Sequence, residues 1–220
     1  MTGETHSAGL VETVRQRMRF YDVALLASVP LVLLSVFVSP TAVRRSLVFE
    51  YTDPSFSAAF ASAFVHFDRL HLFVNLATYT VVVSVVFALA VVSGYRQQFY
   101  VVFFNFVLVL PALLSYLNLA VLRSSIGFGF SGVVMAFAGY LPLSLAEYVE
   151  AQFDIGPRTA VAPMLFFLTL SLIAVLSVQP IVAENTTVFL GTSGLVAATL
   201  LSALLYAVSV SSQGPSLAQK

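Results

Sequence analysis

Six long apolar runs, each close to the length of a membrane-crossing helix, restrict what this chain can fold into. Segments of about 18 or more apolar residues with few charges are typical of helices that span a bilayer. Of the 220 residues, 59% are hydrophobic and only 9% are charged, so a soluble domain could not cover this apolar surface. The runs lie roughly at residues 20–38, 70–92, 99–122, 127–149, 159–178 and 187–210.

The runs predict an all-α membrane protein, a bundle of six transmembrane helices. Backbone groups inside a bilayer must bond to each other, and the short alternating segments of a β-barrel are missing from the sequence. We expect a cytoplasmic tail over 1–19, a membrane domain over 20–210 and a disordered tail over 211–220. Three arginines in the first tail favour placing both termini inside, in a multi-pass protein of a prokaryotic plasma membrane: Arg15, Arg17 and Arg19.

Composition also excludes several classes of site. The chain has no cysteine, which removes disulfides and thiolate metal sites, and its net charge of zero gives no indication of nucleic acid as a partner. Nucleotide-binding loops and metal-ligand clusters are not recognisable in the sequence, so we expect no cofactor and no metal. The long segment 40–68 carries aromatic residues, and we expect an ordered element at the outer interface there.

Polar groups gather at the start of two of the runs. The pattern His66-x4-His71-x3-Asn75 opens the second run, and Gly129-Phe130-Ser131-Gly132 opens the fourth. His71 and Asn75 are four residues apart and therefore share one helix face. With the N-terminus inside, both runs begin at the outer side, so these groups reach one depth, with Ser131 about one turn into its helix. The alternative is that the serine, glycines and asparagine serve only helix packing.

The combination of these two motifs, spaced across six spans, resembles the rhomboid family of intramembrane serine proteases. The resemblance covers about residues 20–210 and implies the roles of several residues. Ser131 would be the nucleophile, and its backbone N–H with His71 and Asn75 would form the oxyanion hole. His66 would be structural, tying the first outer loop to the second span; the alternative is an interface histidine without a notable partner. The substrates or clients would be transmembrane helices of other proteins in the lipid bilayer.

One element of the family pattern is missing. The family takes its base histidine from the sixth span, but no histidine follows His71 here. The aligned position is Gly191, or Phe189 with an offset alignment, and neither residue accepts a proton. Met135, one turn after the serine, stands where some members carry an aromatic ring that stacks on the imidazole.

The sequence therefore predicts a rhomboid-like protein that binds transmembrane clients without cleaving them. An unactivated serine hydroxyl is a poor nucleophile, and loss of a catalytic group typically costs roughly 10⁴ to 10⁶ in rate. Two alternatives stay open. One is an active intramembrane serine endopeptidase that uses Glu184 or His71 as an unusual base. The other is a transporter or a structural bundle whose polar residues only resemble the motif.

Overall fold

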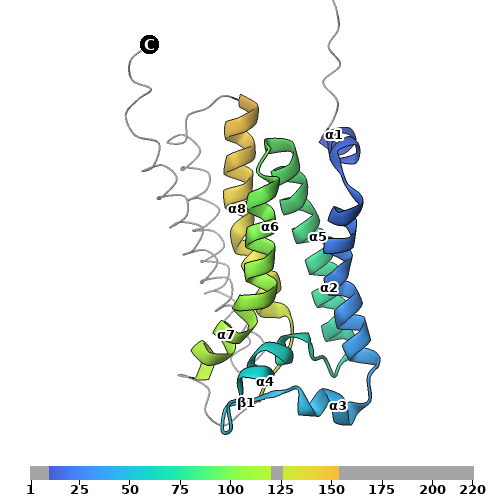
Figure 1. The fold of residues 1–220 in the computed structure, drawn as a ribbon, viewed down its shortest axis with the longest axis vertical. Helices are drawn as coiled ribbons and strands as arrows, with labels where there is room; N and C mark the ends of the chain where they lie inside the picture. The colour runs from blue at the N-terminus through green and yellow to red at the C-terminus, as the bar shows by residue number, and fades with distance from the viewer. Residues whose placement is uncertain (1–9, 120–125, 154–220) are drawn as a thin grey trace, which may run out of the picture.

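The computed structural model describes residues 10–119 and 126–153, which are mostly helical (Figure 1). In chain order the elements are α1 (Leu10–Arg17), α2 (Phe20–Val38), α3 (Thr41–Ser46), β1 (Phe49–Glu50), α4 (Phe56–Ala61), η1 (Ser62–Phe64), α5 (Arg69–Ser93), α6 (Arg96–Phe104), η2 (Asn105–Val109), α7 (Leu110–Leu119), β2 (Ile126–Gly127) and α8 (Ser131–Phe153). Four helical segments are long and apolar enough to cross a membrane: Phe20–Val38, Arg69–Ser93, Arg96–Leu119 and Ser131–Gln152. This is the architecture of a helical membrane protein.

The four segments correspond to the first four apolar runs of the sequence. The first run has the predicted bounds, and the second differs by one residue at each end. The third begins earlier than predicted, at Arg96, because helix α6 includes the polar residues that precede the apolar run. The fifth and sixth runs and the tail 211–220 lie outside the described residues. Within the predicted N-terminal tail, residues 10–17 form α1, which packs against α5.

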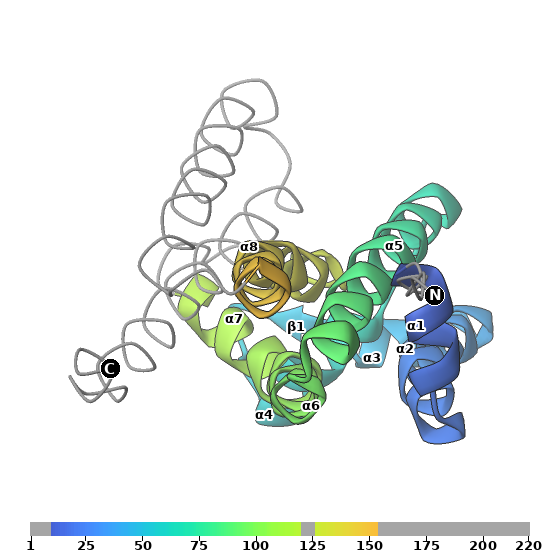
Figure 2. The same ribbon diagram turned by 90° about the horizontal axis from the view of Figure 1, so that it is seen from above.

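Helices α5 and α8 form the centre of the described fold. Figure 2 shows them side by side, with α6 and α2 on the flanks. Aromatic rings fill the space around the buried Phe137 of α8: its ring centroid lies 5.1 Å from that of Phe106, 5.9 Å from Phe103 and 6.3 Å from Tyr79. In a bilayer the lipid tails are as apolar as the side chains, so close packing of this kind holds the helices together.

The third span contains a local irregularity with an identifiable cause. Residues Asn105–Val109 form the π-helix η2, and Pro111 follows directly in α7. Proline has no backbone N–H, and its ring crowds the carbonyl four residues earlier, here that of Val107. A π-helical turn at this point accommodates the misfit without ending the helix.

The connection between α2 and α5 is ordered, and it fixes where α8 begins. Strand β1 pairs with β2 in antiparallel register, Phe49 with Gly127 and Glu50 with Ile126. The sequence predicted a helix from residue 127, but Gly127 is held in this strand and Gly129 has a φ of +105°, so α8 begins at Ser131. Ser131 therefore lies at the first turn of its helix, and not one turn inside it as predicted.

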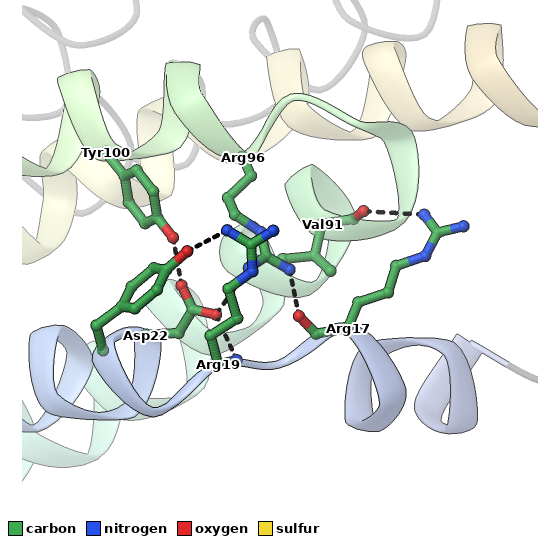
Figure 3. Close-up of polar contacts among 7 residues, drawn as sticks. Arg17, Arg19, Asp22, Val91, Arg96 and Tyr100 are labelled. Atoms are coloured by element: carbon green, nitrogen blue, oxygen red, sulfur yellow. Dashed lines mark hydrogen bonds and ion pairs between the residues drawn. The ribbon is translucent and has the colours of Figure 1, made fainter.

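A buried ion pair joins the start of α2 to the start of α6, at the end of the fold where α1 lies (Figure 3). Asp22 is 0% exposed, and its Oδ2 lies 3.0 Å from Nη1 of Arg96 at the start of α6. The same carboxylate accepts hydrogen bonds from the Arg19 backbone N–H, at 2.7 Å, and from the hydroxyl of Tyr100. Arg96 also donates to the carbonyl of Arg17. The network ties α1, α2 and α6 together.

We predict that Asp22→Asn and Arg96→Met each lower the free energy of unfolding by roughly 2–5 kcal/mol, because each leaves a buried partner uncompensated. The double variant should cost clearly less than the sum of the two, since it removes both charges. An SDS unfolding titration in one detergent measures all three. Arg15→Met is the control, since it removes an exposed arginine of the same region. Additive effects of the two single changes would contradict a coupled pair.

Candidate functional site

His66 lies fully buried in the short segment between η1 and α5. Its Nε2 is 3.0 Å from Nδ2 of Asn75, a residue of α5 that lies one turn after His71. The ring centroid of His66 is 4.8 Å from that of His71. The backbone carbonyl of His66 accepts a hydrogen bond of 2.8 Å from Nη1 of Arg44 in α3. His66 therefore connects the segment that precedes α5 to α5 itself and to α3.

The side-chain amide of Asn75 defines which ring nitrogen of His66 carries the proton. Its Nδ2 donates to the backbone carbonyl of His71 at 3.1 Å. A flipped amide would place Oδ1 against that carbonyl oxygen, so the nitrogen must face it. The second hydrogen of the same nitrogen then points to Nε2 of His66, which must accept. His66 is thus a neutral imidazole with its proton on Nδ1.

Burial explains why His66 is neutral. Desolvation lowers the pKa of this imidazole to about 4, and the neighbouring His71 acts in the same direction, while the backbone carbonyl of Phe64 opposes them. Both amide hydrogens of Asn75 are therefore engaged, one by His66 and one by the His71 carbonyl. To stabilise an oxyanion, as the family resemblance implies, Asn75 would have to break one of these bonds.

The ring of His71 packs directly against Gly129, two residues before Ser131. A Cβ at Gly129 would lie 2.8 Å from Cε1 of His71 and 3.2 Å from its Nε2, so only glycine allows this approach. The Gly129 N–H donates to the carbonyl of Ser62 at 3.0 Å, and Phe128 lies 6.3 Å from the His71 ring between centroids. The polar start of α5 and the serine-bearing segment are thus in contact. Nε2 of His71 is buried and has no hydrogen-bond partner among the described residues.

Ser131 is the first residue of α8, and its side-chain oxygen is buried. No hydrogen-bond partner for this oxygen exists in the described part of the chain. At a helix start the N–H groups of Ser131 and Gly132 have no acceptor within the helix, and the helix dipole makes this end positive. The position can therefore stabilise a negative charge, but no described side chain takes the hydroxyl proton.

Two further predicted site positions have different outcomes. Met135 lies one turn after Ser131 and is partly buried. Gly191, which the sequence predicts at the base position of the rhomboid pattern, lies outside the described residues. Over residues 10–119 and 126–153, no group of three histidine, cysteine, aspartate or glutamate side chains could hold a metal ion.

A small pocket of about 30 Å³ lies beside the serine. Its walls include residues on both sides of Ser131 and come from five segments of the chain: Tyr51, Ser62, Ala63, Pro111, Leu114, Ser115, Gly127, Phe128, Gly129, Gly132 and Val133. Burial raises the pKa of Tyr51 to about 12, so its hydroxyl stays protonated. Sequence reasoning missed Tyr51 and Ser62, which line this pocket, and Arg44, which bonds to the His66 carbonyl, because nothing in the segment 40–68 indicates which of its polar residues make such contacts.

No protein-family model matches this chain, and no curated protein matches its sequence. A function for this chain is therefore inferred from the geometry of the site and from the sequence motifs.

We predict that Gly129→Ala destabilises the protein more than Gly94→Ala, by about 1–3 kcal/mol. Both glycines have positive φ, +105° and +85°, but a Cβ at Gly94 meets nothing within 4 Å, whereas one at Gly129 meets the His71 ring. In a His71→Ala background the additional cost should shrink, since the ring is gone. Unfolding titrations of the four variants test this; equal costs at both glycines would refute the contact.

The protein should lose stability as the pH falls from about 6.5, the ordinary pKa of histidine, toward 4. The unfolded state binds a proton in this window and the buried His66 does not, so each step to lower pH favours unfolding. Melting temperatures between pH 7 and 5 measure the effect. His66→Gln should flatten the profile over that range; an unchanged profile would mean that another group is responsible.

Proposed function

We propose that this chain is a rhomboid-like membrane protein that binds transmembrane segments of client proteins and does not cleave them. The observation that carries the proposal is the buried hydroxyl of Ser131, which has no hydrogen-bond partner in the described part of the chain. A serine becomes a good nucleophile when an adjacent base takes its proton. By resemblance, the family's base position falls on Gly191, or on Phe189 with an offset alignment, and neither side chain could do so.

The donors around the serine support the same proposal. In an active site of this type, side-chain donors point at the place where charge develops and remain free until the reaction. Here the Asn75 amide is engaged by His66 and by the carbonyl of His71. A cluster bonded in this way holds the start of α5 in place, which is a role in the fold rather than in chemistry.

The surface of α5 offers a place for a client helix. Five residues of this helix share one face at spacings of three and four, and all are exposed: Leu70, Phe73, Val74, Ala77 and Val81. The face starts at the end of α5 that carries His71 and Asn75, next to the serine-bearing segment. An apolar helix of another protein that packs on it would reach the depth of Ser131.

A second candidate function is intramembrane proteolysis with His71 as the base. One observation favours it: Nε2 of His71 is buried, has no hydrogen-bond partner among the described residues and lies against Gly129, close in sequence to Ser131. In that role His71 would leave the oxyanion hole and accept the serine proton.

A fluorophosphonate probe and a model transmembrane substrate separate the two functions. With detergent-solubilised protein, we expect labelling and cleavage no higher than for Ser131→Ala. Gly191→His should produce activity that depends on Ser131, since it supplies the missing base. Labelling of the unchanged protein that is lost in both Ser131→Ala and His71→Gln would instead establish the protease with His71 as its base.

Client binding is tested separately by photo-crosslinking. The chain has no cysteine, so a single cysteine at Phe73 or Val74 carries a unique photoreactive label. We expect these positions to crosslink to a transmembrane client in proteoliposomes more strongly than Val101 of α6, whose exposure of 62% lies between the 65% of Phe73 and the 51% of Val74. Equal crosslinking at all three positions would contradict a docking face on α5.

A further inference from the structure

An apolar groove lies between the first and third spans. It meets the candidate serine site at Phe64, whose ring centroid lies 5.5 Å from that of Phe130, the residue before Ser131. The volume of the groove is about 360 Å³, and its walls come from α2, from the end of α3, from α4 with η1, and from the π-helix η2: Ser28, Val29, Val32, Val36, Leu47, Phe60, Ala61, Phe64, Val107 and Leu108. Figure 2, seen from above, shows α2 and α6 on either side of α5. α2 packs on α5 and η1, and it is the least buried of the four spans.

The lining of the groove indicates what kind of molecule fits. Nine of its ten residues are aliphatic or aromatic. The hydroxyl of Ser28, on the α2 wall, already donates to the carbonyl of Leu25 at 2.6 Å. Helices that associate in membranes usually meet through several small residues or through hydrogen bonds between side chains. Only Ser28 and Ala61 are small here, so the groove suits a flexible hydrocarbon chain better than a helix.

A positive charge lies at the α3 end of this groove. The guanidinium of Arg44 stacks on Phe37, which follows the groove residue Val36, with its Cζ 5.2 Å from the ring centroid. Arg44 is also one turn before Leu47, another groove residue. Its Nε is buried and has no partner among the described residues, while its Nη1 and Nη2 donate to neutral oxygens of His66 and Thr41.

Arg45, the next residue of α3, is a second cation two residues before the groove residue Leu47. It is exposed, and among the described residues no acidic group lies within 4 Å of either arginine, because the single salt bridge found there is Asp22–Arg96. Two adjacent arginines at the end of an apolar groove between membrane spans have the chemistry of a phospholipid site. The phosphate would pair with the guanidinium groups, and an acyl chain would fill the groove.

We propose that the groove between α2 and η2 binds one phospholipid, with its phosphate at Arg44 and Arg45 and an acyl chain against Val32 and Leu108. The two residues that would contact the acyl chain are exposed, Val32 at 43% and Leu108 at 54%. The binding places a lipid beside the segment 40–68. Since Arg44 also holds the carbonyl of His66, the lipid phosphate and the His66 cluster share one arginine.

Native mass spectrometry of the purified full chain tests the site. The protein is washed in detergent and then exposed to a phospholipid or to a diacylglycerol with the same acyl chains. We expect one retained phospholipid and about tenfold less diacylglycerol, because the latter has no phosphate. Val32→Trp, which fills the groove, should remove the phospholipid, whereas Leu31→Trp on the neighbouring face of α2 should retain it. Equal retention in the two tryptophan variants would overturn the groove as the binding place.

The arginines are tested through Arg45, because Arg44 also supports His66. Arg45→Gln should reduce the preference for phospholipid over diacylglycerol, and Arg15→Gln, at the other end of the fold, should leave it unchanged. An unchanged preference in Arg45→Gln would refute the phosphate contact. A photoreactive label on a cysteine at position 32 should crosslink to lipid. Crosslinking to another part of this chain or to a second copy would show that protein fills the groove, and would overturn the proposal.

Discussion

The contact between the His71 ring and Gly129 is the interaction on which the candidate site depends. It exists because Gly129 has no Cβ and adopts a φ of +105°, which lets the backbone before α8 approach the first turn of α5. The β1–β2 pair and the bond from Gly129 to the Ser62 carbonyl hold that backbone in position. Without this approach, Ser131 and the polar start of α5 would remain separate features of two different helices.

The hydrogen bonds next to this contact hold the start of α5 to the segment that precedes it. Polar groups in an apolar environment are costly when unpaired, so the amide of Asn75 pairs with both His66 and the His71 carbonyl. A catalytic site needs some of these donors to remain free for the transition state. The arrangement around Asn75 favours stability, whereas the Ser131 oxygen and Nε2 of His71 have no hydrogen-bond partner among the described residues. The proposed role in client binding is consistent with both facts.

Much of the fold could be predicted from the sequence because membrane spans are defined by local composition. The first span was predicted with its observed bounds and the second within one residue, since length and hydrophobicity decide both. The start of α8 was predicted too early. Gly127 and Gly129 are apolar enough to extend the run, but the pairing of Gly127 with Phe49 keeps them in a non-helical conformation, and that pairing depends on a residue 78 positions away.

The sequence by itself determined that the chain forms apolar helices and that two histidines, an asparagine and a serine stand at the starts of two of them. Only the tertiary structure decided which atoms these groups meet. It turned Asn75 toward His66, set His71 against Gly129 and brought Arg44 to the His66 carbonyl. The physical reason is the range of the interactions: hydrophobic length is a property of consecutive residues, whereas a hydrogen bond is decided by a few tenths of an ångström between segments far apart in the chain.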